Sequence, residues 1–194
     1  FDIKAPNKIK PYNLSLPITE IKSKNRVLFI FETPSTDEIN KATLMTGDQG
    51  ALLINLVNYA KKHFIVDKED KDFSWSVINY INSPLPKGSE SRTIYYDYFA
   101  DRVLAYIKKF KPTSIIVFGY KFLRHINSKG FAKAEQYSKK LGIPISITIA
   151  ENNFTVVPTL NLLNLLDASS EEGLSNCLGI VAKHIATGIV GKLQ

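Results

Sequence analysis

The sequence is poor in the residues that build disulfides and metal centres. It has one cysteine, Cys177, and three histidines that lie far apart, His63, His125 and His184. A lone cysteine has no partner for an internal disulfide, and these histidines lack the spacing of metal ligands. We therefore expect no metal and no cofactor, and we interpret the histidines as surface or helix-end residues.

Long hydrophobic runs are also missing. No apolar run is long enough to cross a membrane, and the polar, proline-interrupted stretch 1–24 has no signal-peptide core. We expect a cytoplasmic protein with no membrane partner, in the cytoplasm of the host cell if the chain is viral. The first residue is Phe1 rather than methionine, which is typical of a piece of a longer protein.

Common nucleotide-binding and hydrolase signatures are absent as well. The chain has no GxxxxGK[ST] loop, no GxGxxG after a strand and no GxSxG elbow. What it does have is an excess of positive charge, with a net charge of +7 and a pI near 9.3. This excess favours a polyanion as partner, because each neutralised phosphate releases counterions. A lysine-rich composition can equally reflect an AT-rich genome.

Strand-like and helix-like segments alternate along the chain. Short apolar runs predict strands at 26–31, 75–81, 113–118, 144–150 and 154–157. Helical periodicity predicts helices at 46–64, 93–110, 131–141 and 171–186, with a short helix through Leu123 and Ile126. Strands separated by helices indicate βαβ units, and hence a mostly parallel sheet with helices on both faces. We expect one domain over 1–194, with an N-terminal extension at 1–24 and a core at 25–190.

The ligand of such a sheet binds at the carboxyl ends of the strands. Four loops lie there, at 32–38, 79–88, 119–122 and 158–164. Their sequences are Phe31-Glu-Thr-Pro-Ser-Thr-Asp-Glu38, Asn79 with Pro84-Leu-Pro86, Gly119 after Lys111-Pro-Thr-Ser-Ile, and Pro158-Thr-Leu-Asn-Leu-Leu-Asn-Leu-Leu166. A fifth motif, Gly47-Asp-Gln-Gly-Ala-Leu-Leu53, opens the helix after the first loop.

In this order and spacing the five motifs resemble the uracil-DNA glycosylase superfamily, and most closely its bacterial and archaeal iron–sulfur type. The resemblance spans about Val27 to Leu166. It implies a three-layer α/β/α sandwich with a central, mostly parallel four-stranded sheet. It also implies a site that extrudes a base from DNA and stabilises the charge that develops on the base as it leaves.

The resemblance assigns roles to three polar residues. Glu32 takes the place of the residue that stabilises the sugar or activates water, although a strand-end Glu can also be a solvated or capping residue. Asn79 takes the place of the amide that reads the uracil edge, or it merely ends a strand. Asn161 stands where the family has a histidine that donates a hydrogen bond to the uracil oxygen. Asn can donate but cannot become an imidazolium, and loss of one preorganised donor costs roughly 10²–10³ in rate.

Two apolar residues also stand at base-binding positions. Met45, with Leu44 beside it, replaces the aromatic ring that the family stacks on the base, and both are equally suited to the core. Phe31 replaces a glycine and is large enough to narrow or fill the pocket, and Ser35 replaces a second glycine. The cluster cysteines are absent, and Ser83 stands where one of them would be.

Other residues fit a DNA-holding role. The candidates for gripping phosphates are Ser83, Lys87, Ser89 and Arg92, in a segment that is equally typical of a solvated turn. Leu162 and Leu163 follow the last motif, where relatives insert a wedge into the duplex, although the same run suits the start of a buried helix.

Three functions stay open from the sequence. The first is a DNA-binding, glycosylase-like domain with weak or no uracil excision in replication or repair, as in the glycosylase-like domains fused to some bacteriophage DNA polymerases. Its partners would be DNA and replication proteins or a polymerase in the same chain. The second is an active uracil-DNA glycosylase, and the third is a protein-interaction module of the processivity type that poxviruses use.

Overall fold

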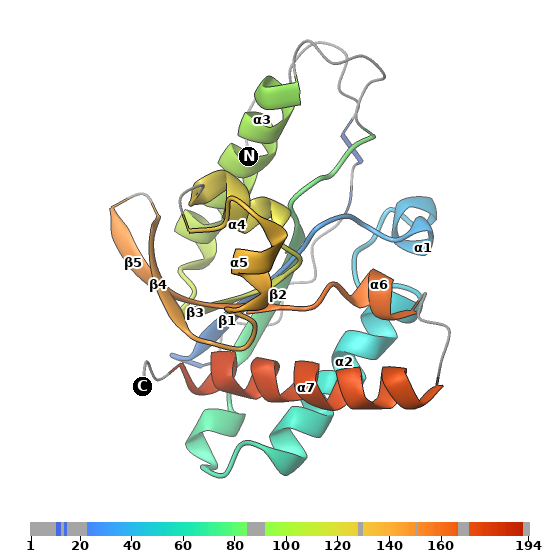
Figure 1. Ribbon diagram of the computed structural model, residues 1–194, viewed down its shortest axis with the longest axis vertical. Coiled ribbons are helices and arrows are strands. Elements are labelled where there is room, and N and C mark those ends of the chain that lie inside the picture. The colour runs from blue at the N-terminus through green and yellow to red at the C-terminus, as the bar shows by residue number, and fades with distance from the viewer. Residues whose placement is uncertain are drawn as a thin grey trace.

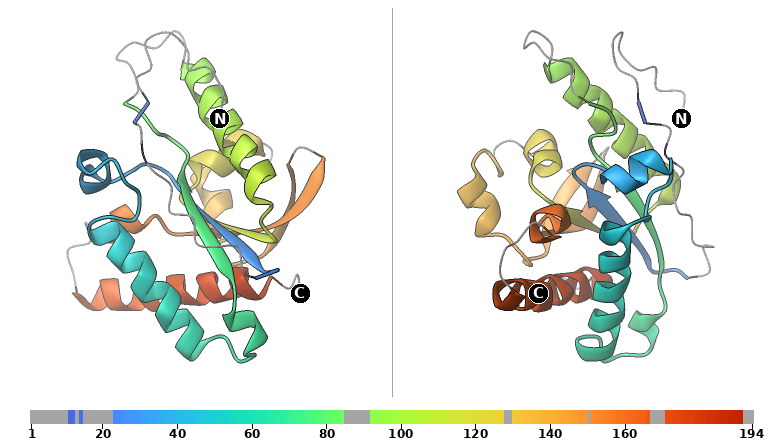
Figure 2. Two further views of the ribbon diagram at one scale, coloured as in Figure 1. Left: turned by 180° about the vertical axis from the view of Figure 1, so that it is seen from behind. Right: turned by 90° about the vertical axis from the view of Figure 1, so that its right-hand side faces the viewer.

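The computed structural model describes residues 11–12, 14, 23–84, 92–127, 130–149, 151–166 and 171–191. These residues form a twisted sheet between two layers of helices (Figures 1 and 2). None of the described helices combines the length and the apolar composition that crossing a membrane requires.

The sheet has five strands in the order β2-β1-β3-β5-β4. They are β1 (Arg26–Phe31), β2 (Ser74–Asn79), β3 (Ser114–Phe118), β4 (Ile145–Ile149) and β5 (Asn152–Thr159). The first four strands in this order run parallel, and β4 pairs antiparallel with β5 at one edge. The α/β architecture with helices on both sides is therefore as predicted. The count of four strands is corrected to five in a mixed sheet.

The physical reason for the mixed sheet is the short connection between β4 and β5. Only two residues separate Ile149 from Asn152, and a parallel pair needs a crossover of a dozen or more residues. The two strands must therefore form a hairpin. Glu151 in this turn has a φ of 69°, in the left-handed region that tight hairpin turns use.

The helices cover the sheet in two groups. They are α1 (Thr36–Asn40), α2 (Asp48–His63), α3 (Arg92–Phe110), α4 (Lys121–Ile126), α5 (Ala134–Ser138), α6 (Leu162–Leu166) and α7 (Glu171–Val190), with a 3₁₀ turn at Glu69–Lys71. The long helices α2, α3 and α7 and the short helices α4 and α5 lie where periodicity predicted them, to within a few residues. The five-residue helices α1 and α6 are too short to show helical periodicity in the sequence.

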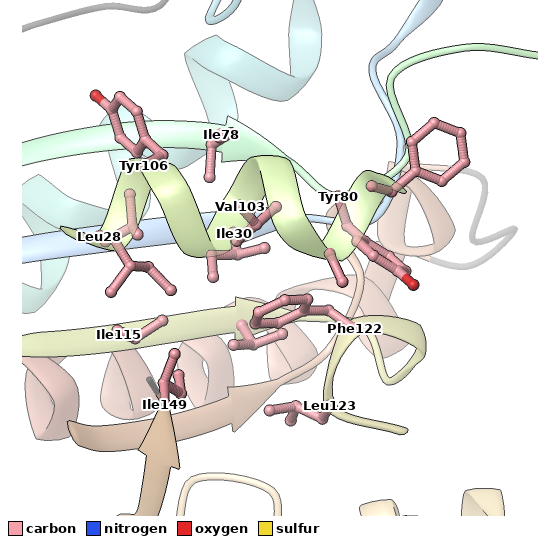
Figure 3. Packing of buried hydrophobic residues seen from close by; sticks show 14 of the residues in the cluster. Leu28, Ile30, Ile78, Tyr80, Val103, Tyr106, Ile115, Phe122, Leu123 and Ile149 are labelled. Atoms are coloured by element: carbon pink, nitrogen blue, oxygen red, sulfur yellow. The ribbon is translucent and has the colours of Figure 1, made fainter. Parts of the chain in front are cut away.

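One face of the sheet packs against α3, α4 and α5. Alternate strand residues point to this side, and Figure 3 shows Leu28, Ile30 and Ile115 grouped beneath Val103 of α3. Phe122 of α4 is 1% exposed in the same cluster.

The other face packs against α2 and α7. Here Val27, Phe29 and Phe31 of β1 meet Leu53 of α2 and Ile185 of α7, all of them buried. The helix α2, which follows β1, therefore covers one face of the sheet, and the helices α4 and α5, which follow β3, cover the other. A switch point of this kind opens a crevice at the carboxyl ends of the two strands, and it fixes where a ligand site is expected.

Candidate functional site

Glu32 lies at the carboxyl end of β1, at the switch point. Its Oε2 accepts a hydrogen bond of 3.0 Å from Nδ2 of Asn161. Its Oε1 accepts a hydrogen bond of 3.3 Å from the backbone N–H of Lys121, whose Nζ is 3.9 Å away. The side chain of Glu32 is 12% exposed. The carboxylate therefore joins the ends of β1, β3 and β5 while one side of it still reaches solvent.

Asn161 is engaged at both ends of its amide. Besides the bond to Glu32, its Oδ1 accepts the backbone N–H of Leu163 at 3.1 Å, which caps the start of α6. The sequence prediction that residues 32 and 161 converge on one site is consistent with this contact. The hydrogen bonds of Asn161 differ from those expected of a histidine at this position. Its amide oxygen accepts the bond that caps α6, and one of its N–H groups donates to the Glu32 carboxylate.

Gly119 makes the close approach of Glu32 possible. Its φ is +96°, and a Cβ there would lie 2.6 Å from the Glu32 side chain, nearer than two carbons can approach. The Tyr137 hydroxyl fixes the same loop, because it accepts the Gly119 N–H at 3.1 Å and donates to the backbone oxygen of Thr159. Burial raises the pKa of Tyr137 and keeps the hydroxyl protonated, so that it remains a donor.

A row of buried side chains crosses the sheet at its carboxyl edge. The strand register aligns Asn79 with Phe31, Phe31 with Phe118, and Phe118 with Thr159. Phe31 is 1% exposed, and its ring centroid lies 4.8 Å from that of Phe118. Phe31 thus fills the interior of this row.

The amide of Asn79 is closed off behind this row. Its side chain is 1% exposed, and neither Nδ2 nor Oδ1 has a hydrogen-bond partner among the described residues. Its backbone oxygen accepts a hydrogen bond from the guanidinium of Arg102, which also reaches the Tyr80 oxygen at 3.3 Å. Burial lowers the pKa of Arg102 to about 10. Arg102 therefore anchors the end of β2, a role that helical periodicity in α3 gave no means to foresee.

Met45 borders the α2 face rather than forming a stacking platform. It is half-buried at the edge of the apolar cluster, with Leu44 at 2% exposure beside it. Its backbone N–H donates to Oε1 of Glu38 at 2.7 Å. A Cβ on Gly50 would lie 2.3 Å from the Met45 oxygen, so the Gly-x-x-Gly motif serves this close backbone contact.

Glu38 ties the loop that follows Glu32. It is fully buried, and its carboxylate also accepts the backbone N–H of Ser35 at 2.9 Å, which completes a capping box on α1. Burial raises the pKa of Glu38 despite these bonds. The acidic end of the first motif is therefore structural: it holds the loop beside the crevice.

Of the four candidates for contacting phosphates, Ser83 alone has a side chain that the structure describes. Ser83 is buried and lines a cavity of about 280 Å³, with Tyr96 and Lys121 among the other lining residues. Lys87 and Ser89 lie outside the described residues, and Arg92 begins α3 with a side chain that is not described.

The leucines after Asn161 divide between core and surface. Leu162 is fully buried in the α2 and α7 cluster, which corrects the expectation that it enters a duplex. Leu163 is half-buried and lines a second cavity of about 430 Å³ between α1, α2 and α6. The run Leu-Leu-Asn-Leu-Leu forms α6, and its i and i+3 positions, Leu162 and Leu165, face inward.

Gln49 is the residue that the sequence interpretation missed. It lies in the first turn of α2, is 1% exposed and lines the same 430 Å³ cavity. Neither atom of its side-chain amide has a hydrogen-bond partner within the described part of the chain. A glutamine inside a motif with helical spacing looks like an ordinary polar position, so only its burial reveals it.

No protein-family model matches this chain, and no curated protein matches it significantly. Within the described residues, no group of three or more His, Cys, Asp and Glu side chains is arranged to hold a metal ion. The functional argument therefore depends on the geometry at the carboxyl edge.

Proposed function

We propose that this protein is a DNA-binding domain of the uracil-DNA glycosylase type that holds an extruded nucleotide and excises uracil weakly or not at all. Such a domain serves replication or repair by recognising DNA. The catalytic half of the proposal depends on one observation, the hydrogen bond of 3.0 Å between Asn161 and Glu32.

This bond bears directly on catalysis. In the family that the sequence resembles, the residue at position 161 donates to the oxygen on which charge develops. Here the amide oxygen of Asn161 is used by α6, and one of its N–H groups is used by Glu32. An amide also cannot supply the positive charge of an imidazolium. We therefore expect excision slower by roughly 10²–10³ than with a dedicated donor.

The binding half of the proposal is supported by Asn79. A buried amide without hydrogen bonds costs about 1–3 kcal/mol, so a chain that keeps one needs a compensating use for it. The edge of a base supplies adjacent donors and acceptors that satisfy both atoms of an amide, once the side chains that cover Asn79 move aside. The net charge of +7 favours the phosphates that accompany such a base.

The test combines binding with excision. A fluorescent single-stranded oligonucleotide with one uracil is titrated over a range of salt concentrations, and free uracil is measured in the same samples. We expect binding that weakens with salt, by a slope of about −0.7 for each phosphate contact, and little uracil release. Rapid release by the wild-type protein would refute impairment. A lack of binding at low salt would refute the DNA-binding claim and favour a protein-interaction module.

Asn161→His provides the matched gain-of-function test. An imidazole at this position can donate to the leaving base, so we expect uracil release to rise by about 10-fold or more over the wild type. Asn164→His is the control, because Asn164 is exposed on the same short helix. An equal effect of both substitutions would contradict the role assigned to position 161.

An active glycosylase is the second candidate, and the position of Glu32 favours it. The carboxylate lies at the switch point and is partly open to solvent, where it can orient a water. If the wild type does release uracil, Glu32→Ala should abolish the release. Unchanged release from that variant would remove Glu32 from the reaction.

A further inference from the structure

The 430 Å³ cavity between α1, the start of α2 and α6 has a wall of mixed chemistry. Leu163 and Leu166 of α6 lie on one side, with Pro34 on the loop after β1, and Gln49 comes from α2. Leu166 is 39% exposed, so the apolar side is partly open to solvent. A flat, partly apolar ring fits such a wall better than an ion does.

Gln49 is buried at this wall, and its side-chain amide has no hydrogen-bond partner among the described residues. Its Nε2 and Oε1 both have less than 1 Å² of accessible surface. Leu53, one helical turn later on the same side of α2, packs with Phe31 in the core. Gln49 therefore points toward the sheet face that carries Asn79.

The two unpaired amides lie at different places. Figure 1 shows α2 beginning beside α1 and α6, and Gln49 in its first turn lines the cavity. Asn79 ends β2 and is buried, and it is not among the residues that line this cavity. Gln49 therefore presents one donor and one acceptor to the cavity, a pattern that matches the edge of a nucleobase.

The charges around the cavity indicate which part of a nucleotide enters. Asp37 and Asp48 line it, and a Cβ on Gly47 would lie 2.3 Å from the Asp37 carboxylate. These acids lie at the N-terminus of α2 and offset its positive end. A phosphate is disfavoured beside two carboxylates, whereas a neutral base with N–H donors is not.

We propose that Gln49 is a specificity-determining residue that reads the edge of an unpaired nucleobase lodged against the 430 Å³ cavity, while the phosphates stay outside it. This rests on the proposed function, and it adds a residue and a cavity to it. Contact of a base with this amide requires the side chains that cover Gln49 to move aside, because both of its amide atoms have less than 1 Å² of accessible surface.

The test compares Gln49→Leu with the wild type on two single-stranded oligonucleotides, one carrying a central base and the other an abasic analogue at that position. Loss of two hydrogen bonds predicts about 10-fold weaker binding of the base-containing strand and unchanged binding of the abasic strand. Asn55→Leu, an exposed amide on the same helix, is the control and should change neither.

The outcomes separate the two proposals. If the wild type binds neither strand at low salt, the proposed function fails. If the wild type binds both strands and Gln49→Leu weakens both equally or neither, the DNA-binding claim stands and the role of Gln49 is overturned. Melting temperature controls for folding: replacing a buried, unpaired amide by an apolar side chain should raise it. If the melting temperature falls instead, Gln49→Met is tested on the same pair of strands and decides whether Gln49 contacts the base.

Discussion

Replacing Asn161 by alanine removes two hydrogen bonds whose contributions differ and can be added. The bond from the Leu163 N–H is a helix cap, and losing a cap costs about 1 kcal/mol. The bond to Glu32 involves a charged partner and is worth about 1.5–3 kcal/mol in favourable cases. Glu32 keeps its contacts with Lys121 and can recruit water, so the lower end applies. We expect a total loss of about 2–3 kcal/mol in the free energy of unfolding.

Urea denaturation followed by circular dichroism measures this loss as a lower midpoint at an unchanged m value. Asn161→Ser isolates the two parts, because serine caps a helix but is too short to reach Glu32, and it should recover about 1 kcal/mol. Asn164→Ala is exposed on α6 and should stay within about 0.5 kcal/mol of the wild type.

A double-mutant cycle between Glu32→Ala and Asn161→Ala gives the coupling of the pair directly. We expect a coupling energy of about 1 kcal/mol or more. A coupling near zero, or an Asn161→Ala variant as stable as Asn164→Ala, would show that the two side chains do not meet in solution. The argument for impaired catalysis would then lose its basis.

Two further predictions concern the loops around this pair. Gly119→Ala places a Cβ 2.6 Å from the Glu32 side chain at a φ of +96°, so it should cost about 1–3 kcal/mol, measured by the same urea titration, and a cost near zero would contradict the close packing. Burial raises the pKa of Glu38, so the folded state binds its proton more tightly than the unfolded state. The stability of the wild type relative to Glu38→Gln should therefore increase as the pH falls through the raised pKa toward 4.5, and a decrease on this approach to pH 4.5 would refute burial as the dominant cause.

Much of the fold could be predicted from the sequence because its long elements carry strong periodic signals. The apolar runs of β1 and β3 and the spacing of Leu53, Leu56 and Ala60 in α2 are local patterns that tertiary contacts reinforce. The strand β4 was predicted at 144–150, but its antiparallel pairing with β5 was not, because only the two-residue connection at 150–151 reveals it.

The site was predictable only as far as strand ends determine it. The rule for parallel sheets brought Glu32 and Asn161 together, and the structure adds their hydrogen bond. The rule could not reveal that the Asn79 side chain is buried, since that depends on packing by residues distant in the sequence. Gln49 and Arg102 act through contacts distant in sequence, and nothing in their local sequence distinguishes them from ordinary helix residues.

The position of bound DNA on the protein is the most direct test of the central claim. Backbone amide resonances are followed by two-dimensional NMR while a short uracil-containing single strand is added. We predict shifts that cluster after β1, β2, β3 and β5, at residues 32–35, 79–83, 119–121 and 159–163, together with the start of α2. Shifts confined to the amino ends of the strands, or no shifts at low salt, would contradict the account.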